Sequence, residues 1–375
     1  YGQNAAVDLS RGMQQMARRK ISIYDQALNV FFVGIHLGCL LVIPGGFSWF
    51  ALAVCVALYA FRMFAITAFY HRYFAHRTYK TSRPFQFIMG VAGATCLQNG
   101  PLWWSAHHRH HHRHSDTEED IHSPITGGLF WAHIGWILSK KYSTYNQDDV
   151  RDLAKFPELR FLQRFHAIPA LSIGVGLFFL GDYLAASAPE LGTNGLQLLA
   201  WGFFVSTTVL YHACFTINSL MHTFGRRRFD TDDESRNSLI LALITFGEGW
   251  HNNHHRYHAS ERQGFYWWEI DLSHYGLTVL SWFGLVRDLK RPPRWIYEEA
   301  EGKRDRKMTP GRRRNADRSV IPSVRAAAAE GDEVVAAENG AGNGSTNGAS
   351  ANGSSANEKT PKVNDPSLAD ADLAS

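Results

Sequence analysis

Four long apolar segments dominate the hydropathy pattern of the chain. The first two cover residues 27–45 and 47–69, meet at a Pro-Gly-Gly turn that begins at Pro44, and contain a single charged residue, Arg62. The other two cover residues 168–186 and 196–217 and are joined by a polar loop. About 20 apolar residues cross a bilayer as a helix. The pattern therefore predicts an all-α integral membrane protein with four transmembrane helices arranged as two hairpins.

Two shorter apolar segments, residues 85–97 and 128–138, separate the hairpins. Both are too short to cross a bilayer, so we expect the first to lie in the interface or to re-enter and the second to lie at the interface. Trp131 and Trp136 in the second segment suit the headgroup level, where aromatic side chains are enriched. For the first hairpin, a pair of buried helices in a large soluble protein is the alternative interpretation.

Positive charge predicts which side of the membrane each loop occupies. Arg18, Arg19 and Lys20 precede the first span, and Arg226–Arg228 follows the second hairpin. Loops rich in Lys and Arg face the cytoplasm. We therefore predict a multi-pass protein with both termini on the cytoplasmic side. Its parts are a polar N-terminal segment (1–24), a membrane-embedded domain (25–300) and a disordered tail (301–375) rich in Ala, Gly, Asn and Ser.

Three histidine clusters fall on this predicted cytoplasmic side, where a helical cap would hold them. Ser105 to Asp116 contains six of the chain's 19 histidines, and it fits a His-x-x-His-His spacing in two frames. Histidines three and four residues apart share one face of a helix, and imidazole is a common ligand of transition metals. The clusters are His71-x4-His76, either His107/His110/His111 or His108/His111/His112, and His251-x-x-His254-His255.

Composition narrows the chemistry further. The mean hydropathy of −0.23 averages apolar spans with a polar tail, and a net charge of +4 is too small to indicate nucleic-acid binding. The four cysteines lie in apolar stretches without a Cys-x-x-Cys pair, so disulfides and a zinc finger are not expected. An internal histidine run interrupted by arginines is also unlike an expression tag.

Over residues 20–295 the sequence resembles the membrane fatty-acid desaturase family, and most closely its delta-9 acyl-CoA desaturase branch, the stearoyl-CoA desaturase-like enzymes. The three boxes occur in the family's order, each after the expected membrane segment. Asn218-x3-His222 and Gly247-Glu-Gly-Trp-His251 match as well. The family's second box has Arg directly after its first histidine, so Arg109 favours the frame that begins at His108, with Asp116 at the acidic position downstream.

The resemblance implies a site with two Fe ions, Fe²⁺ in the reduced state, and O₂ as co-substrate, without further catalytic residues. Asn218 would hold a water on the second iron. The implied ligands of the first iron are His71, His76, His108, His112 and His254, and those of the second are His111, His222, His251 and His255.

The implied reaction is the oxygen-dependent introduction of a cis double bond, at the delta-9 position, into a saturated acyl chain during unsaturated fatty acid biosynthesis. A bent apolar tunnel would select the bond by position. Its wall candidates are Trp103, Trp104, Trp131 and Trp136. A membrane di-iron hydroxylase acting on a lipid or hydrocarbon is the nearest alternative.

The acyl carrier is either CoA or a membrane lipid. The acyl-CoA enzymes have a basic residue two positions before the second box, where this chain has Ala106. Lys140 and Lys141 fall where another basic pair would contact a phosphate. We find no iron–sulfur, haem or dinucleotide motif, so electrons must come from a donor such as ferredoxin, or cytochrome b5 with its reductase. Arg226–Arg228 or Lys290 and Arg291 offer basic docking surfaces.

Three other interpretations remain from residue types alone. Zinc accepts the same ligands but has no redox chemistry. A soluble di-iron carboxylate bundle needs Glu-x-x-His pairs, which occur at Glu119/His122 and Glu248/His251 but beside glycines or a proline. A metal sensor or transporter would need histidines within the spans, for which His36 and His212 are the candidates.

Overall fold

The structure is a computed structural model that describes residues 23–302, nearly all of them in helices and the loops between them. The basic cluster at Arg18–Lys20, residues 1–22 of the predicted polar segment and residues 303–375 of the predicted tail lie outside the described residues. A single pair of two-residue strands, β1 (Lys80–Thr81) and β2 (Val286–Arg287), forms the sheet of the described part. The predicted helical class is confirmed.

Three helices of the described part are long and apolar enough to cross a membrane. They are Trp49–Ala75, Ile168–Ser187 and Gly195–His222, with mean hydropathies of 2.0, 1.6 and 1.5. The first predicted span is also helical, as α2 (Ile23–Gly38), η1 (Cys39–Leu41) and α3 (Val42–Gly45), but its apolar part, Val30–Gly45, is shorter. Three spans are therefore supported by length and composition, and the fourth stays a prediction.

The second predicted span extends beyond the predicted end at residue 69. It consists of α4 (Trp49–Phe64) followed by η2 (Ala65–Ala75), a π-helical segment in which every residue is buried. His71 therefore lies on the helix and not past its end, and His76 is its C-cap residue. Polar residues at positions 71 and 72 suggested a helix end, but they are covered by protein and do not stop the helix.

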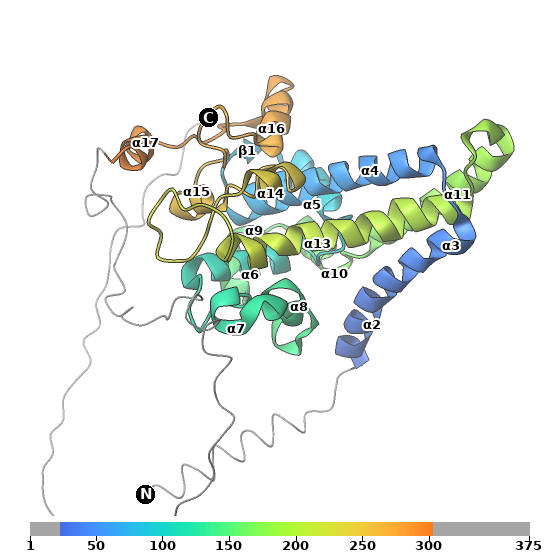
Figure 1. Cartoon of the computed structure of the whole chain (residues 1–375), viewed down its shortest axis with the longest axis horizontal. Coiled ribbons are helices and arrows are strands. Elements are labelled where there is room, and N and C mark those ends of the chain that lie inside the picture. The colour runs from blue at the N-terminus through green and yellow to red at the C-terminus, as the bar shows by residue number, and fades with distance from the viewer. Residues whose placement is uncertain (1–22, 303–375) are drawn as a thin grey trace, which may run out of the picture. The chain divides into compact units, whose positions relative to one another are not determined.

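The second hairpin consists of α11 (Ile168–Ser187) and a continuous helix built from α12 (Gly195–Leu198), η7 (Leu199–Val205), α13 (Ser206–Ser219) and η8 (Leu220–His222). Figure 1 shows α4, α11 and α13 running alongside one another. Arg62 of α4 is completely buried against α13 and η7. It donates hydrogen bonds to the hydroxyls of Thr207 and Ser206 and to the carbonyl of Gly202. Neutral oxygens thus satisfy the guanidinium of Arg62, the one charged residue of α4.

Shorter helices form a cap at one end of the long ones (Figure 1). The cap contains α5 (Arg83–Ala94), α6 (Pro101–His114), α7 (Pro124–Phe130), η3 (Trp131–Gly135), α8 (Trp136–Leu138), η4 (Lys140–Tyr142), η5 (Gln147–Val150), α9 (Arg151–Ala154), α10 (Pro157–Arg164), α14 (Leu239–Ile244), α15 (His251–Arg256), α16 (Leu272–Trp282) and α17 (Arg294–Ala300).

A core of fully buried side chains joins the cap to η2, with Tyr70, Phe74 and Met89 at its centre. The ring of Tyr70 packs directly on Gly93 of α5, where an added Cβ would lie 2.0 Å from a ring carbon. The small residues of this segment thus permit close helix packing. Because η2 carries one histidine box and α6 another, this core fixes the distance between the two boxes.

Arg109 of α6 fastens the C-terminal end of η2. Its guanidinium donates hydrogen bonds of 2.8 Å to the carbonyl oxygens of Phe74 and Ala75, and it pairs with Asp152 at 2.7 Å. Carbonyls at a helix end have no partner within the helix. Arg109 satisfies two of them while its neighbours His108 and His111 point elsewhere.

We predict that Arg109→Gln will lower the free energy of unfolding by about 1–3 kcal/mol, because hydrogen bonds from a charged donor to buried carbonyls are lost. The measurement is thermal unfolding of the purified protein in detergent. Arg151→Gln is the matched control, since Arg151 forms an exposed pair with Asp148 that should contribute little. Equal melting temperatures for the two variants would contradict the role of Arg109.

Candidate metal centre

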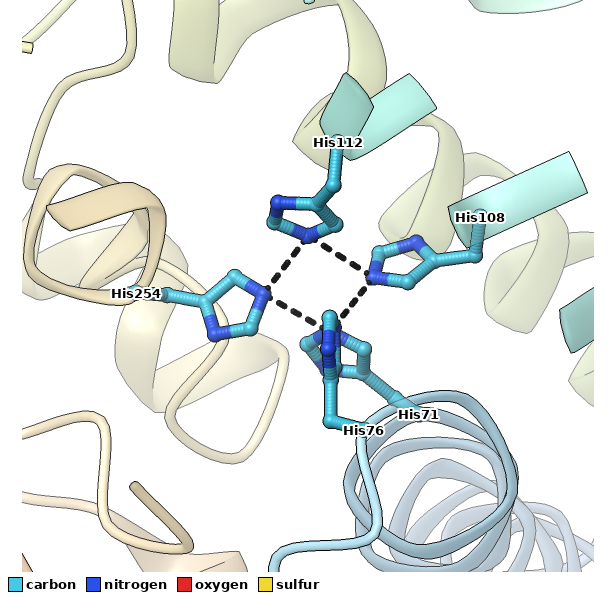
Figure 2. A group of neighbouring side chains, drawn as sticks. All are labelled: His71, His76, His108, His112 and His254. Carbon is cyan, nitrogen blue, oxygen red and sulfur yellow. Dashed lines mark hydrogen bonds between the residues drawn. The ribbon is translucent and has the colours of Figure 1, made fainter. Parts of the chain in front are cut away.

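Five imidazoles from three separate segments converge in the first histidine group. Figure 2 shows His71 and His76 at the end of η2, His108 and His112 on α6, and His254 on α15. Their Nε2 atoms form a chain of contacts, with 2.8 Å between His76 and His108 and 2.9–3.0 Å for each of the other three contacts. One ligand atom from each of the five lies within 4.8 Å of the others.

A second group lies beside the first. It consists of His111, His222, His251 and His255, all buried, again with one ligand atom each within 4.8 Å of the others. The Nε2 atoms of His222 and His251 are 3.1 Å apart, and the rings of His111 and His255 are 5.2 Å apart. The two groups share helices: α6 and α15 each contribute histidines to both.

The local backbone explains each spacing. His71 and His76 are five residues apart, which puts them on the same side of a π-helical turn, and the amide of His76 donates to the carbonyl of His71 at 3.2 Å. On α6, His108 and His112 are one turn apart, and His111 lies beside them. On α15, the same spacing of three and four residues places His251, His254 and His255 on one side of the helix. The first helical amides of α6 donate to the side-chain oxygen of Gln163.

Carboxylates hold the outer nitrogens of four of these histidines. The Nδ1 atom of His111 lies 3.0 Å from Asp120, that of His222 lies 2.8 Å from Asp116, and that of His255 lies 2.6 Å from Asp233. In the first group, Nδ1 of His71 is 2.5 Å from Glu248. A carboxylate on Nδ1 fixes the proton there and turns the Nε2 lone pair inward, the usual arrangement behind a metal-binding histidine.

The electrostatics favour the neutral form for six of the nine imidazoles. Burial, reinforced by the neighbouring rings, lowers the pKa of five histidines well below its ordinary value: His76, His108, His112, His251 and His254. Burial likewise lowers the pKa of His255 to about 4. Although burial alone would raise the pKa of Asp116, its contact with His222 holds that pKa at about 2. Neutral imidazole is the form that binds metals.

The arrangement fits a bound metal in each group. With Nδ1 protonated against a carboxylate, the Nε2 atoms of His111 and His255 carry lone pairs, and both are buried without a hydrogen-bond partner. Inward lone pairs at about 3 Å repel one another unless a cation lies between them. An all-nitrogen donor set is suited to iron, copper, nickel or zinc rather than to magnesium or calcium.

The other histidines of the α6 run belong to neither group. His107 contacts the carbonyl of Trp103 at 2.9 Å, His110 contacts the carbonyl of Glu119 at 2.9 Å, and His114 pairs with the carboxylate of Glu119 at 2.6 Å. Geometry thus agrees with the frame that begins at His108. A third set, His111, Asp120 and His122, also has ligand atoms within 4.8 Å, but it shares His111 with the second group.

Two alternatives receive no support from the geometry. Glu248 contacts His71 and Arg72 rather than His251, and Glu119 is exposed, so the two Glu-x-x-His pairs do not form a carboxylate bundle. His36 contacts His212 at 3.2 Å, and His212 contacts His133 at 3.1 Å. His133 also contacts the hydroxyl of Ser219, the last residue of α13. Among the described residues, no hydrogen bond joins these three histidines to the two metal-binding groups.

An apolar cavity of about 530 Å³ ends at the histidines. His71, His108, His111 and His251 form part of its wall, and Asn218, one turn before His222, lies on it as well. Trp103, Trp104 and Trp136 line the cavity, whereas Trp131, Lys140 and Lys141 do not. The side chain of Lys141 lies over the ring of Tyr142 instead. The cavity thus brings apolar surface, but not the lysine pair, up to the metal-binding groups.

Comparisons with known proteins agree with this site. The family model for fatty acid desaturases matches residues 47–279. The chain belongs to the fatty acid desaturase family. It is 36% identical to the sn-1 stearoyl-lipid 9-desaturase of Anabaena variabilis, over 70% of this chain and 92% of that protein. It is 34% identical to Delta-9 acyl-lipid desaturase 1 of Arabidopsis thaliana (75% and 88%), and 37% identical to Acyl-CoA C20 Delta5-desaturase of Anemone leveillei (73% and 84%).

The predicted family and its delta-9 branch are therefore confirmed, and the protein is a fatty acyl desaturase of membranes, an oxidoreductase that introduces a double bond into an acyl chain. Its histidine clusters fit a metal site.

Sequence reasoning missed most of the residues that orient the histidines of this desaturase. Asp116 was recognised, but Asp120, Asp233 and the contact from Glu248 to His71 were not. Asp233 lies 22 positions from its histidine, and only the fold brings them together. A signal was available for Asp120, since an acidic residue shortly after a histidine helix is a common partner for its outer nitrogens.

Loss of one of these carboxylates should weaken metal binding. We predict that Asp233→Asn will reduce the metal affinity of the second histidine group by about 10- to 100-fold, because the amide orients His255 without its negative charge. Metal content after dialysis against graded chelator, measured by mass spectrometry, tests this. Asp148→Asn, at an exposed carboxylate, should retain the metal. Identical retention curves would rule out a role for Asp233.

Proposed function

We propose that this desaturase introduces a cis double bond at the delta-9 position of a saturated acyl chain, using O₂ and two external electrons. The observation that carries the proposal is the convergence of nine histidines, six buried and three partly buried, at the end of an apolar cavity. Two of the relatives above are named as delta-9 desaturases. The balanced reaction consumes the acyl chain, O₂, two electrons and two protons, and it yields the alkene and two waters.

The proposed cofactor is a pair of iron ions. His71, His76, His108, His112 and His254 would hold one of them, and His111, His222, His251 and His255 would hold the other, with Asn218 positioned to bind a water. When bound, the iron pair supplies the oxidising power that removes hydrogen from an unactivated methylene. Imidazole donors and the redox character of the reaction favour iron over zinc.

The protein's own contribution is positioning and the exclusion of water. Trp103 and Trp136 stack with ring centres 5.9 Å apart, and Trp104 stacks on His108 at 5.0 Å. These rings give the cavity rigid apolar walls next to the histidines. A chain held there presents one methylene pair to the metal centre, so that the position of the double bond is set by the wall rather than by a chemical group on the substrate.

The proposed topology has four crossings, with the histidines and both termini on the cytoplasmic side. Two spans end at the metal centre, since His71 lies near the end of one and His222 at the end of another. An external donor such as ferredoxin, or cytochrome b5 with its reductase, would supply electrons from that side. Of the predicted basic docking residues, Arg228 pairs with Glu269 and Lys290 donates to the carbonyl of Arg77, while Arg226 stays exposed.

The test is fatty-acid profiling of cells that express the chain with a compatible electron donor. We expect new cis-9 monoenes. The position of the double bond is identified from the fragment masses of their dimethyl disulfide adducts. His254→Ala should abolish them, to at least about 100-fold below wild type. The reason is that His254 contacts both His71 and His112 within the first group.

The matched control is His114→Ala, which removes a histidine of the same run that lies outside both groups. It should leave the product yield within about twofold. Hydroxy acids in place of monoenes would instead assign the hydroxylase reaction. Equal activity of the His254 and His114 variants would overturn the proposed site.

A further inference from the structure

The cavity has one open side. Among its lining residues within the described part, three are exposed: Phe31, Arg164 and Leu171. Phe31 is 37% exposed and Leu171 is 43% exposed. They belong to α2, to the end of α10 and to α11. The histidine end is buried, so a chain must enter between these three elements. We call Phe31, Arg164, His166 and Leu171 the mouth.

The mouth lies where a membrane span begins. The span Ile168–Ser187 starts two residues after His166, and most of its exposed side chains are apolar, with Val175 58% and Phe179 66% exposed. Just before it, Phe161 and Phe165 are also exposed. Exposed aromatic and aliphatic residues beside the start of a span are typical of the boundary between headgroups and acyl chains. The open side of the cavity therefore faces lipid and not bulk water.

One positive charge marks this mouth. Arg164 is the only Lys or Arg among the cavity-lining residues of the described part. Its guanidinium has no hydrogen bond or ion pair in that part of the chain and lies only near the ring of Phe165, at 5.6 Å. Next to it, the buried Nδ1 atom of His166 also lacks a partner. Unpaired donors beside an apolar channel are suited to an anionic group attached to a long acyl chain.

We propose that the substrate is an acyl chain still esterified to a membrane glycerophospholipid, which enters sideways between α2 and α11 while Arg164 binds the headgroup phosphate. This inference rests on the proposed function and names its acyl carrier. A glycerophospholipid has one phosphate close to its acyl ester, and the mouth has one free arginine. Its second acyl chain would remain among the exposed apolar residues Phe161, Phe165 and Leu171.

An acyl-CoA fits this mouth less well. Its carrier is large, water-soluble and bears several phosphates, for which clusters of basic residues are the expected partners. Lys140 and Lys141 do not line the cavity, and Ala106 is buried, with 2% exposure. Arg109 and Arg113 on α6 are already paired with Asp152 and Asp149. The free positive charge is thus at the lipid side of the cavity.

The experiment uses the full chain, loaded with iron and reconstituted in dioleoyl phosphatidylcholine vesicles with a reduced electron donor. Deuterated stearoyl chains are supplied either in 1-stearoyl phosphatidylglycerol within the vesicles or as stearoyl-CoA in solution. Intact products are analysed by mass spectrometry without hydrolysis. We expect labelled monoene in the phosphatidylglycerol. Labelled oleoyl-CoA, with no product in the lipid, would overturn the inference and leave the proposed function intact.

Arg164→Gln tests the phosphate contact. We expect kcat/KM for the phosphatidylglycerol to fall about 5- to 10-fold, the effect of one arginine facing an anionic lipid. With the uncharged monogalactosyldiacylglycerol the same variant should change by less than about twofold, and its iron content should not change. An equal fall with both lipids would show that Arg164 acts on the fold and not on phosphate.

Lipid retention provides a readout that does not depend on turnover. Native mass spectrometry of the protein released from detergent should show less bound phosphatidylglycerol for Arg164→Gln than for Arg151→Gln, whose exposed arginine lies outside the cavity. Equal retention would count against the mouth. Iron-loaded, reducible protein that acts on neither carrier would overturn the proposed function, and the inference with it.

Discussion

The fold of this desaturase depends on bringing nine imidazoles together in two adjoining groups. Desolvation disfavours their charged form, and carboxylates on four outer nitrogens hold the protons away from the centre. The cost is the burial of four carboxylates, each of which must be satisfied by hydrogen bonds. Asp116 illustrates the solution: besides His222 it accepts from the hydroxyl of Ser123 and the amide of Glu234.

The same constraint explains a buried ionic network below the first group. Glu248 contacts His71 and is held by Arg72 and Gln263. Arg72 in turn pairs with Asp271 at 2.9 Å, which caps the N-terminus of α16. A histidine near the end of a membrane span is thus tied to a cap helix 200 positions later in the sequence. Removing one partner would leave a buried charge uncompensated, so the network holds its members together.

Much of this arrangement could be predicted from the sequence because its signals are local. Apolar length located the spans, and the spacing of His108, His111 and His112 indicated a shared helix face. The His71/His76 spacing was recognised only as a pattern, since five residues do not share a face of an α-helix and the π-helical turn is imposed by packing. Asp233 and Arg164 could not be found, because their partners or their cavity arise from segments far apart in the chain. No periodic pattern in the sequence marks these two residues.

Placing the metal-binding groups at the ends of two spans resolves a conflict between the two kinds of reactant. An acyl chain is available in the bilayer, whereas an electron donor arrives through water. His71 and His222 lie near the ends of the candidate spans Trp49–Ala75 and Gly195–His222, so in the proposed topology the centre lies at the border of the two phases. The cavity runs from there to the mouth between α2 and α11, which faces lipid in the proposed arrangement. Substrate can then reach the histidines without passing through water, and the donor can approach the cap without entering the membrane.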